Sequence, residues 1–438
     1  MGRPLGTRTG PPVVIYVGAF ARLRDKLASL DDRKAMQDVP LPEPSILRTI
    51  ADLFIESCKL YPTEADRKNA VPPLLEKLLD VNFSRRHPIS PGEKLAEFDA
   101  VNTIDVDGAV QAYTLIVEVK NELGISGASG VQCAFIYEQA VALPRYQLIR
   151  NPPCCPSILL AVAGPYLCFY GAILADTFVV QPFTDYIYLG GDPNPDARIV
   201  HTARRFLAFR EAIRELRSYF RGLHQDIPGP PRAARLPCPT YTTSSDAIRN
   251  LRFIDRFRYE GLRNDDQDHV DRSLFSAELN DKAVLVKFCT RYGADAHRYY
   301  LAGRNLAPVL HHCIKLVGQV TMVVMNVVED AASAYYKYIN RDLPKSLVDK
   351  VEEVVKALHD EGYVHGDIHR PNIMVREGDT LSVMLMDFDW AGKAGKTHYP
   401  VSLNLSGNIA WAAGTEAGGL IVMGHDDHMV EMLREGGK

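Results

Sequence analysis

The segment of residues 364–392 constrains the fold of this chain more than any other, because it sets three polar side chains around two short apolar runs. Asp367 is followed by Asn372 five residues later, and Asp387 comes directly after the second run. Apolar runs on either side of a polar, glycine-containing turn predict a β-hairpin, which would bring Asn372 back beside Asp387. The predicted strands and turn are residues 373–375, 383–386 and 377–379.

These three side chains have the chemistry that phosphoryl transfer requires. Asp367 can position an attacking hydroxyl and accept its proton. Asn372 and Asp387 offer the hard oxygen ligands that Mg²⁺ prefers. Two unrelated polar turns would be the alternative, but the spacing and the intervening hairpin favour one site for magnesium and a nucleotide triphosphate.

The same residues resemble the catalytic core of the protein-kinase-like superfamily. The order H-G-D-x-x-x-x-N followed by D-F-D-W-A-G is most similar to the fungal-type kinases and to the kinase modules of Crinkler-type proteins. The resemblance covers residues 246–438. It implies a bilobal fold, ATP and Mg²⁺ as cofactors, and a protein serine or threonine as the phosphate acceptor.

The resemblance also assigns residues upstream of the hairpin. Lys287 lies in a β-branched run, residues 283–288, and would contact the nucleotide phosphates. The alternative is a strand-edge lysine that discourages sheet pairing. Met325, in residues 323–328, would lie at the hinge whose backbone pairs with adenine.

Within the hairpin segment the resemblance gives each polar residue a role. Asp367 would act as the base, and Asn372 with Asp387 would hold the metal. His369 or Arg370 would neutralise the charge on the transferring phosphate.

Several positions depart from the kinase pattern. No G-x-G-x-x-G precedes Lys287, since Gly261 is the only glycine in the expected loop, and no glutamate follows before residue 323. Asp295 and His297 are the nearest polar candidates for the missing lysine partner. Asp389 stands where protein kinases carry glycine, as in small-molecule phosphotransferases, so the acceptor stays open. A nucleotide-binding pseudokinase scaffold is therefore an alternative.

Length and composition predict two domains. A chain of 438 residues with 46% hydrophobic and 24% charged residues is globular and too long for one ordinary core. A proline-rich stretch, residues 227–245, cannot sustain helix or strand and is predicted to be a linker. The predicted parts are an N-terminal extension (1–39), a first domain (40–226), the linker (227–245) and a kinase-like domain (246–438).

The first domain carries a second set of polar residues. Glu118 and Lys120 end a predicted strand, Asp99 lies in an earlier strand-like segment, and Gln132 follows on a predicted helix. This order resembles the D…E-x-K signature of restriction-endonuclease-like nucleases, with a mixed sheet and flanking helices. It implies metal ligation by Asp99 and Glu118, with Lys120 activating water, and DNA as a partner.

Three readings of the first domain remain open. It can be a metal-dependent DNA nuclease with a regulatory kinase domain, an inactive nuclease fold kept as a binding module, or a fold with only a strand-end salt bridge. The overall fold class is thus α/β plus α+β, the second domain being bilobal with a shortened C-lobe.

The remaining features point to a soluble protein without a membrane partner. A net charge of -4 gives no global attraction to nucleic acid, and eight scattered cysteines lack zinc-ligand spacing. The apolar residues 157–174 are broken by Gly164-Pro165 and predict a buried hairpin. The arginines of a predicted helix, residues 201–224, could contact phosphates, but such a row is more typical of the solvated face of a packed helix. We expect a cytoplasmic or nuclear location, or a host nucleus as the Crinkler resemblance implies.

Overall fold

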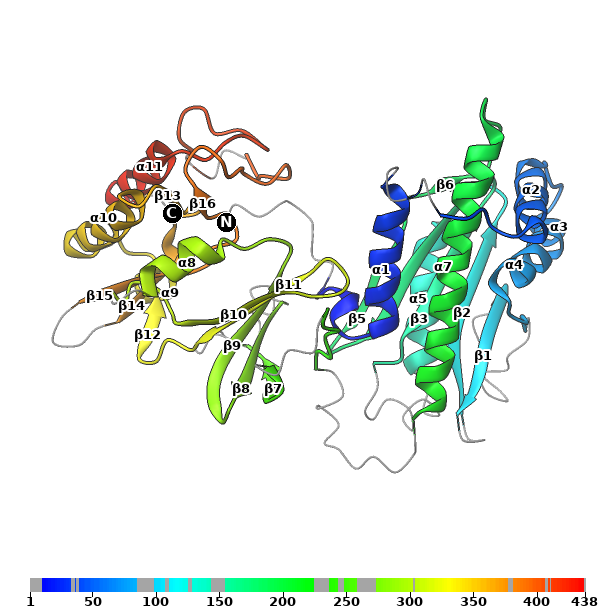
Figure 1. Cartoon of the computed structure of the whole chain (residues 1–438), viewed down its shortest axis with the longest axis horizontal. Coiled ribbons are helices and arrows are strands. Elements are labelled where there is room, and N and C mark those ends of the chain that lie inside the picture. The colour runs from blue at the N-terminus through cyan, green and yellow to red at the C-terminus, as the bar shows by residue number, and fades with distance from the viewer. Residues whose placement is uncertain are drawn as a thin grey trace. The chain divides into compact units, whose positions relative to one another are not determined.

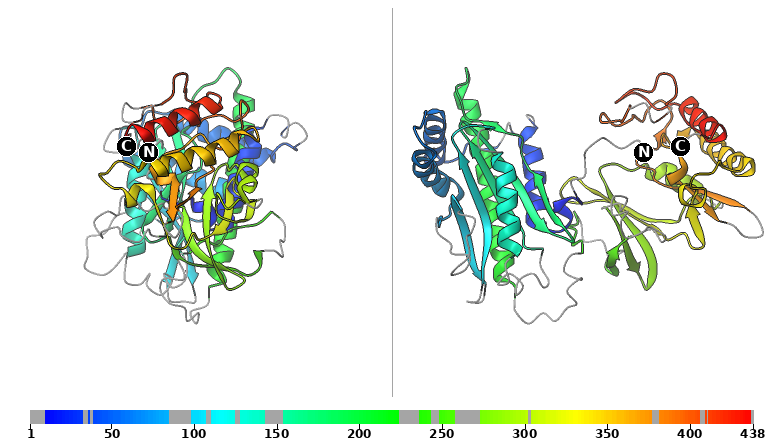
Figure 2. Two further views of the ribbon diagram at one scale, coloured as in Figure 1. Left: turned by 90° about the vertical axis from the view of Figure 1, so that its left-hand side faces the viewer. Right: turned by 180° about the vertical axis from the view of Figure 1, so that it is seen from behind.

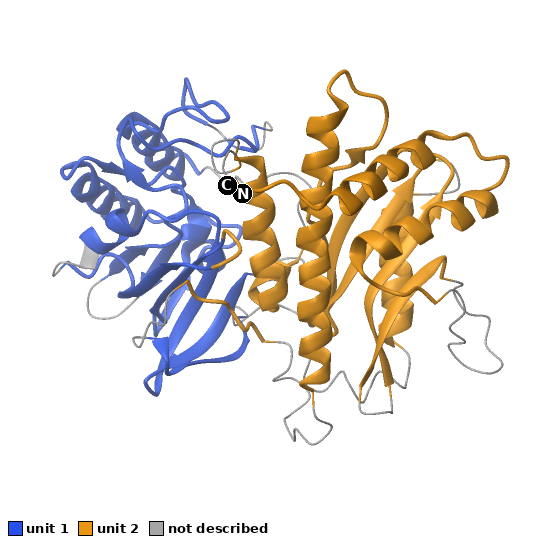
Figure 3. Ribbon diagram, turned by 45° about the vertical axis from the view of Figure 1, so that its right-hand side comes forward, with its two compact units in different colours: residues 1–8, 244–316, 320–438 blue, residues 9–243, 317–319 orange. Residues whose placement is uncertain are grey.

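The computed structural model divides into two compact units, coloured separately in Figure 3. The N-terminal unit is Thr9–Thr243 with Val317–Gln319, and the C-terminal unit is Ser244–Leu316 with Val320–Lys438 and residues 1–8. The structure describes residues 10–32, 36, 39–84, 98–106, 110–124, 128–142, 154–223, 236–242, 248–257, 273–301, 304–376, 381–405, 409 and 411–436.

A mixed sheet forms the centre of the N-terminal unit (Figure 1). Its order is β1-β2-β3-β4-β5, with β6 paired to β4. β2 and β3 run parallel and every other pair is antiparallel. Every residue of β3 and nearly all of β2 are buried, as expected for strands covered on both faces. The strands are β1 (Ala100–Val106), β2 (Val110–Lys120), β3 (Ser157–Ala163), β4 (Tyr166–Leu174), β5 (Phe178–Pro182) and β6 (Ile187–Tyr188).

Helices cover the two faces of this sheet. Along β4, Phe169 stacks on Phe209 of α7, whereas Tyr170 and Ala172 pack in the cluster built around α5. α7 and α5 therefore lie on opposite faces, as Figure 1 and the right-hand view of Figure 2 show. The helices are α1 (Gly18–Asp31), α2 (Pro44–Cys58), α3 (Glu64–Ala70), α4 (Pro72–Leu79), α5 (Ser129–Ala142) and α7 (Pro195–Arg221).

The buried hairpin predicted over residues 157–174 is confirmed, with β3 and β4 antiparallel and the turn at Gly164 in the left-handed region. The helix predicted at residues 201–224 begins earlier, at Pro195, because Asn194 caps it and Pro195 is favoured in a first turn. Most of the predicted linker, residues 227–245, lies outside the described residues. Among the described helices, none combines the length and apolarity needed to cross a bilayer.

The C-terminal unit begins with an antiparallel sheet of order β10-β11-β9-β8-β7. Asn280 and Asp281 both have positive φ, which matches the type I′ turn that favours a two-residue hairpin between β8 and β9. α8 (Ala294–Leu301) follows β9. The strands are β7 (Leu251–Arg256), β8 (Leu274–Leu279), β9 (Lys282–Cys289), β10 (Leu310–Lys315) and β11 (Thr321–Asn326).

The rest of this unit packs helices against a second hairpin. β14 and β15 pair antiparallel, with Ile373 opposite Leu385, and they overlap the two predicted strands. This hairpin is therefore confirmed. Its predicted turn, residues 377–379, lies outside the described residues. A core of apolar side chains joins the hairpin to α10 and α11. The elements are β12 (Ala331–Ser333), α9 (Ala334–Lys337), α10 (Lys345–His359), β13 (Tyr363–Val364), η6 (Arg370–Asn372), β14 (Ile373–Arg376), β15 (Ser382–Leu385), β16 (Gly392–Lys393) and α11 (Met423–Arg434).

Candidate functional site

The loop that carries Asp367 is fixed by a buried carboxylate from the last helix. Asp426, in the first turn of α11, has no exposed surface. Its Oδ2 accepts from the backbone N–H of His365 at 2.7 Å, and its Oδ1 accepts from that of Gly366 at 2.7 Å. His359 Nε2 lies 3.1 Å from the same Oδ2. The backbone that leads into Asp367 is therefore fixed by a residue about sixty positions later in the sequence.

Gly366 suits this loop for a steric reason. Its φ of +82° lies in the left-handed region, and a Cβ there would stand 2.8 Å from Ile421 Cδ1. The neighbouring His365 is fully buried and makes a 2.9 Å contact from Nε2 to the Met386 carbonyl oxygen. This contact ties the Asp367 loop to the end of β15.

Asp367 and Asn372 are joined directly. Asn372 Nδ2 donates to the Asp367 carboxylate and to its carbonyl oxygen, each at 3.0 Å. His369 Nδ1 lies 3.3 Å from the other Asp367 carboxylate oxygen. Because the Asn372 amide nitrogen is used in this way, its amide oxygen is the atom left to bind a cation. Arg370 is buried, and its guanidinium donates to backbone carbonyls, including that of Arg341 at 2.9 Å.

Asp387 and Lys287 meet from different parts of the unit. Lys287, on β9, is 6% exposed, and its Nζ lies 2.5 Å from Asp387 Oδ1 and 2.8 Å from Asp389 Oδ1. Asp387 has a φ of +63°, an uncommon value for a non-glycine residue and one that recurs at functional loops. The sequence-predicted lysine and metal ligand are thus brought into contact, and Asp389 joins them.

The partner of Lys287 is one that sequence reasoning did not find. Asp295, on α8, keeps 80% of its side chain exposed and pairs with Arg298. His297 is buried, bonded to the Pro308 carbonyl oxygen and stacked on Phe388 at 4.5 Å. The signal in the sequence was Asp389, the second aspartate of D-F-D. Its backbone carbonyl also accepts from Arg291 Nε at 3.1 Å.

Met325 lies near this site but within the sheet. Its Cα pairs with Leu310 on one side and Leu285 on the other, and its side chain is 3% exposed. The same apolar cluster includes Met386, the residue before Asp387. A backbone contact from Met325 to adenine stays a prediction, and β11 ends just after it at Asn326.

The donor atoms of the C-terminal site suit magnesium. Among the described residues there is no group of three or more His, Cys, Asp or Glu side chains arranged to hold a metal. Mg²⁺ needs no such group, because it usually keeps several waters and binds one or two carboxylates together with substrate phosphates. Asn372 and Asp387 lie on adjacent segments, since Met386 N donates to the Asn372 carbonyl at 2.9 Å. The amide and carboxylate oxygens fit the ion.

A second polar cluster lies in the N-terminal unit, where β1 begins and β2 ends. Asp99 directly precedes β1, and its Oδ2 accepts from the Val119 backbone N–H at 2.8 Å. Glu118 is 4% exposed; burial and the neighbouring Asp99 carboxylate both raise its pKa. Lys120 follows at the strand end, and Gln132 lies half-buried in the first turns of α5. Three of the four predicted residues thus gather at one edge.

Two residues of α3 complete this cluster and were not foreseen from the sequence. Lys68 Nζ lies 2.5 Å from Glu64 Oε1 and 2.7 Å from Asp99 Oδ1. Lys120 Nζ lies 3.3 Å from the same Glu64 oxygen. Burial opposes the charge on Lys68, but its hydrogen bonds to Asp99 and Glu64 outweigh that effect and raise its pKa.

This cluster, as it is arranged, does not fit a divalent metal. Both oxygens of Asp99 already have partners, the Val119 N–H and the Lys68 ammonium. The metal that the nuclease resemblance implies would have to compete with Lys68.

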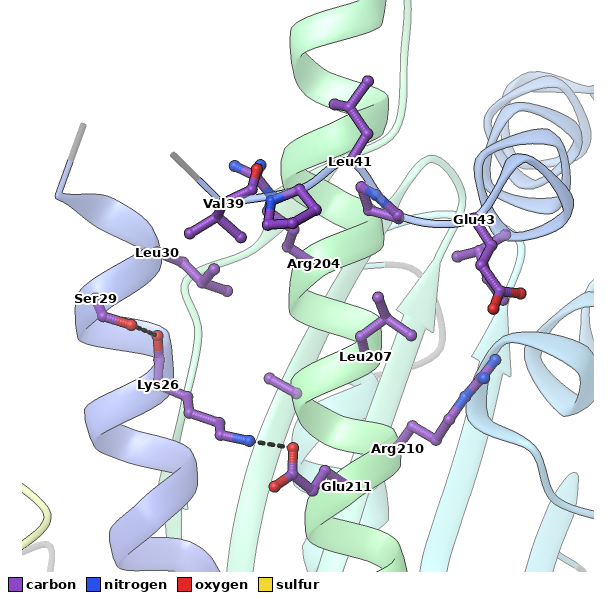
Figure 4. Close-up of a pocket in the computed structure, with 14 residues that line it drawn as sticks. Lys26, Ser29, Leu30, Val39, Leu41, Glu43, Arg204, Leu207, Arg210 and Glu211 are labelled. Carbon is purple, nitrogen blue, oxygen red and sulfur yellow. Dashed lines mark hydrogen bonds and ion pairs between the residues drawn. The ribbon is translucent and has the colours of Figure 1, made fainter. Parts of the chain in front are cut away.

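A cavity of about 460 Å³ lies elsewhere in the N-terminal unit, between α1, α7 and the segment before α2 (Figure 4). Several of its charged side chains contact neighbouring segments. Lys26 pairs with Glu211, Arg204 donates to the Val39 carbonyl at 2.7 Å, and Arg210 donates to a backbone carbonyl of α4. The cavity includes none of the predicted site residues, and its arginines act as packing contacts.

Comparison with known proteins gives only structural neighbours. No protein-family profile and no curated protein matches the sequence. The Cydia pomonella granulovirus kinase PK-1 is similar to it with a TM-score of 0.34 and 12% identity, over 43% of this chain and 68% of that one. The Mycobacterium tuberculosis PknI kinase domain matches with a TM-score of 0.26 and 16% identity, over 37% and 66%. At these values the chemistry has to come from the side chains themselves.

Replacing Asp426 with Asn should destabilise the C-terminal unit. The amide offers one acceptor oxygen and a donor nitrogen, so one of the N–H groups of His365 and Gly366 loses its partner while buried. We expect the free energy of unfolding to fall by about 2–3 kcal/mol, measured by denaturant titration. Asp427→Asn is the control, because that side chain is 67% exposed and should change stability by less than about 0.5 kcal/mol. Equal effects of the two variants would contradict the role of Asp426.

His297 should make the stability of this unit depend on pH. Burial lowers its pKa from 6.5 to about 4. A group whose pKa is depressed on folding contributes stability above its unfolded pKa, which is lost as pH falls toward the folded value. Between pH 6.5 and 4 the wild type should lose roughly 3 kcal/mol that the His297→Asn variant does not lose.

Unfolding curves at several pH values measure this difference, with His398→Asn as the control because His398 is exposed. A wild type and a His297→Asn variant with parallel pH profiles would show that the buried imidazole does not titrate in this window.

Proposed function

We propose that the C-terminal unit is an ATP- and magnesium-dependent phosphotransferase of the protein-kinase type, related to the fungal Crinkler-like kinases, with a protein serine or threonine as acceptor. One observation carries the proposal. The strand lysine Lys287 contacts Asp387, while Asp367 and Asn372 are hydrogen-bonded to each other on the loop that precedes the same hairpin. Four residues from three parts of the chain form the set that positioning and charge stabilisation require.

When bound, the magnesium nucleotide supplies the phosphoryl group that is transferred. Asp387 and the amide oxygen of Asn372 provide its protein oxygen ligands. Lys287, already held among carboxylates at the end of β9, brings positive charge to the nucleotide phosphates.

Asp367 handles the acceptor. One of its carboxylate oxygens accepts a hydrogen bond from the Asn372 amide, and the other lies beside His369. These contacts orient the carboxylate, so that it can hold the acceptor hydroxyl and take its proton as the phosphoryl group transfers. His369, at 3.3 Å, is placed to balance negative charge there. The contacts of Arg370 with backbone carbonyls make it a residue that shapes the loop.

The proposal is tested with the full chain and γ-labelled ATP, using a generic protein and the chain itself as acceptors. Asp367→Ala and Asp387→Asn should each lower transfer by about 100- to 10,000-fold, because base and ligand are lost. Asp295→Asn is the matched control and should transfer at the wild-type rate, since Asp295 is exposed and not in contact with Lys287.

Transfer that survives in both Asp367→Ala and Asp387→Asn would refute the proposal. A wild type that is stabilised against heat by ATP but transfers nothing would instead support the pseudokinase alternative. Label on the generic protein or on the chain itself would support a protein acceptor.

DNA cleavage by the N-terminal unit stays a prediction, drawn from Asp99, Glu118 and Lys120. It is tested by plasmid nicking in Mg²⁺, which should be lost in Lys120→Ala. The same assay on Asp367→Ala separates nicking from phosphotransfer, because Asp367 belongs to the other unit. Absence of nicking in the wild type would count against this function.

A further inference from the structure

The polar cluster of the N-terminal unit already contains a cation at its centre. Lys68 Nζ bridges Glu64 Oε1 at 2.5 Å and Asp99 Oδ1 at 2.7 Å. The second ammonium, Lys120 Nζ, is farther from Glu64, at 3.3 Å. A positive charge shared between two carboxylates is the place that a metal ion would otherwise take.

Glu118 adds an independent sign of a cation position. It is 4% exposed, and within the described residues its Oε1 has no hydrogen-bond partner. A buried carboxylate oxygen without a partner is costly and uncommon. Glu118 and Lys120 are two residues apart on β2 and share a face of the sheet, and Lys120 Nζ lies 3.3 Å from Glu64, so Glu118 faces this cluster.

The Asp99 oxygen that Lys68 contacts becomes accessible to another cation when the Lys68 side chain moves, while the helix that carries it stays in place. The helix that carries it is fixed by Arg67, which is 3% exposed and donates to the carbonyls of Ser57 and Lys59 at 3.0 and 2.8 Å. A capping box between Thr63 and Asp66 closes its first turn. The Lys68 side chain itself is 28% exposed and can swing toward solvent without moving α3.

We propose that the Lys68 ammonium is the built-in counter-ion of this pocket, and that a divalent metal binds Asp99 and Glu118 only by displacing it. Lys68 then sets how well the unit binds metal, because ammonium and metal cannot share the Asp99 oxygen and repel each other when close. The nuclease-like edge is closed to metal at low ion concentration and opens when Lys68 is removed or drawn away. This inference concerns the N-terminal unit and does not depend on phosphotransfer by the other.

The test measures Mn²⁺ binding to the full chain by calorimetry, with Asp387→Asn present throughout to remove the C-terminal ligand. Lys68→Met should bind Mn²⁺ at least tenfold more tightly than the Lys68 protein. Lys68→Arg keeps a cation in place and should bind as weakly as the Lys68 protein. Lys26→Met is the matched control, since it removes a lysine from the Glu211 pair of the same unit. It should leave Mn²⁺ affinity unchanged.

A third variant locates the ion. Adding Asp99→Asn to Lys68→Met should abolish the gain, with folding of each variant checked by circular dichroism. Equal Mn²⁺ affinity with and without Lys68, tight binding by Lys68→Arg, or a gain that persists in Asp99→Asn would each overturn the inference. Because binding is measured directly, the result does not depend on whether the unit cleaves DNA.

Discussion

The candidate site of the C-terminal unit depends on one buried charge, the carboxylate of Asp426. Burying a carboxylate away from water costs free energy, and this cost is offset only when the carboxylate oxygens are fully hydrogen-bonded. Here both oxygens are used, by two consecutive backbone N–H groups and by His359. The arrangement fixes the path of the chain into Asp367, and with it the carboxylate to which Asn372 donates. Local chemistry at the loop is thus set by a helix far along the sequence.

A second constraint links the sheet to this loop. Lys287 projects from β9 to two aspartates that flank Phe388, and Phe388 packs between His297 and His365. The aromatic contacts position the backbone on which both aspartates lie. Asp387 has a left-handed φ, which is a strained backbone conformation for a residue other than glycine, and the surrounding contacts maintain it. Pairing with Asp389 explains how a strand lysine is held without a glutamate on the following helix.

Local patterns foretold the parts of the site that neighbours in sequence determine. The hairpin after Asp367 followed from two apolar runs and a turn, and the buried hairpin of β3 and β4 followed from apolar runs on either side of Gly164-Pro165. The partners that come from distant segments gave no such signal. In the sequence, Asp426 looks like any acidic residue near the start of a helix. Its role in fixing the Asp367 loop appears only when the fold places it beside His365. Lys68 and Glu64 are likewise an ordinary helical pair until β1 and β2 bring Asp99 to them.

The two units share one arrangement of charges, a lysine between two carboxylates, but it has a different role in each. In each, one lysine pairs with two carboxylates, Lys287 with Asp387 and Asp389, and Lys68 with Glu64 and Asp99. Lys287 is 7% exposed in its side chain and extends from a central strand, so it stays at the site while ligands arrive. Lys68 is 28% exposed and extends from a seven-residue helix, so solvent can receive it. The lysine is therefore a fixed part of the C-terminal site, whereas in the N-terminal cluster it is a counter-ion that a metal can displace. The difference follows from the element that carries the lysine and from the exposure of its side chain.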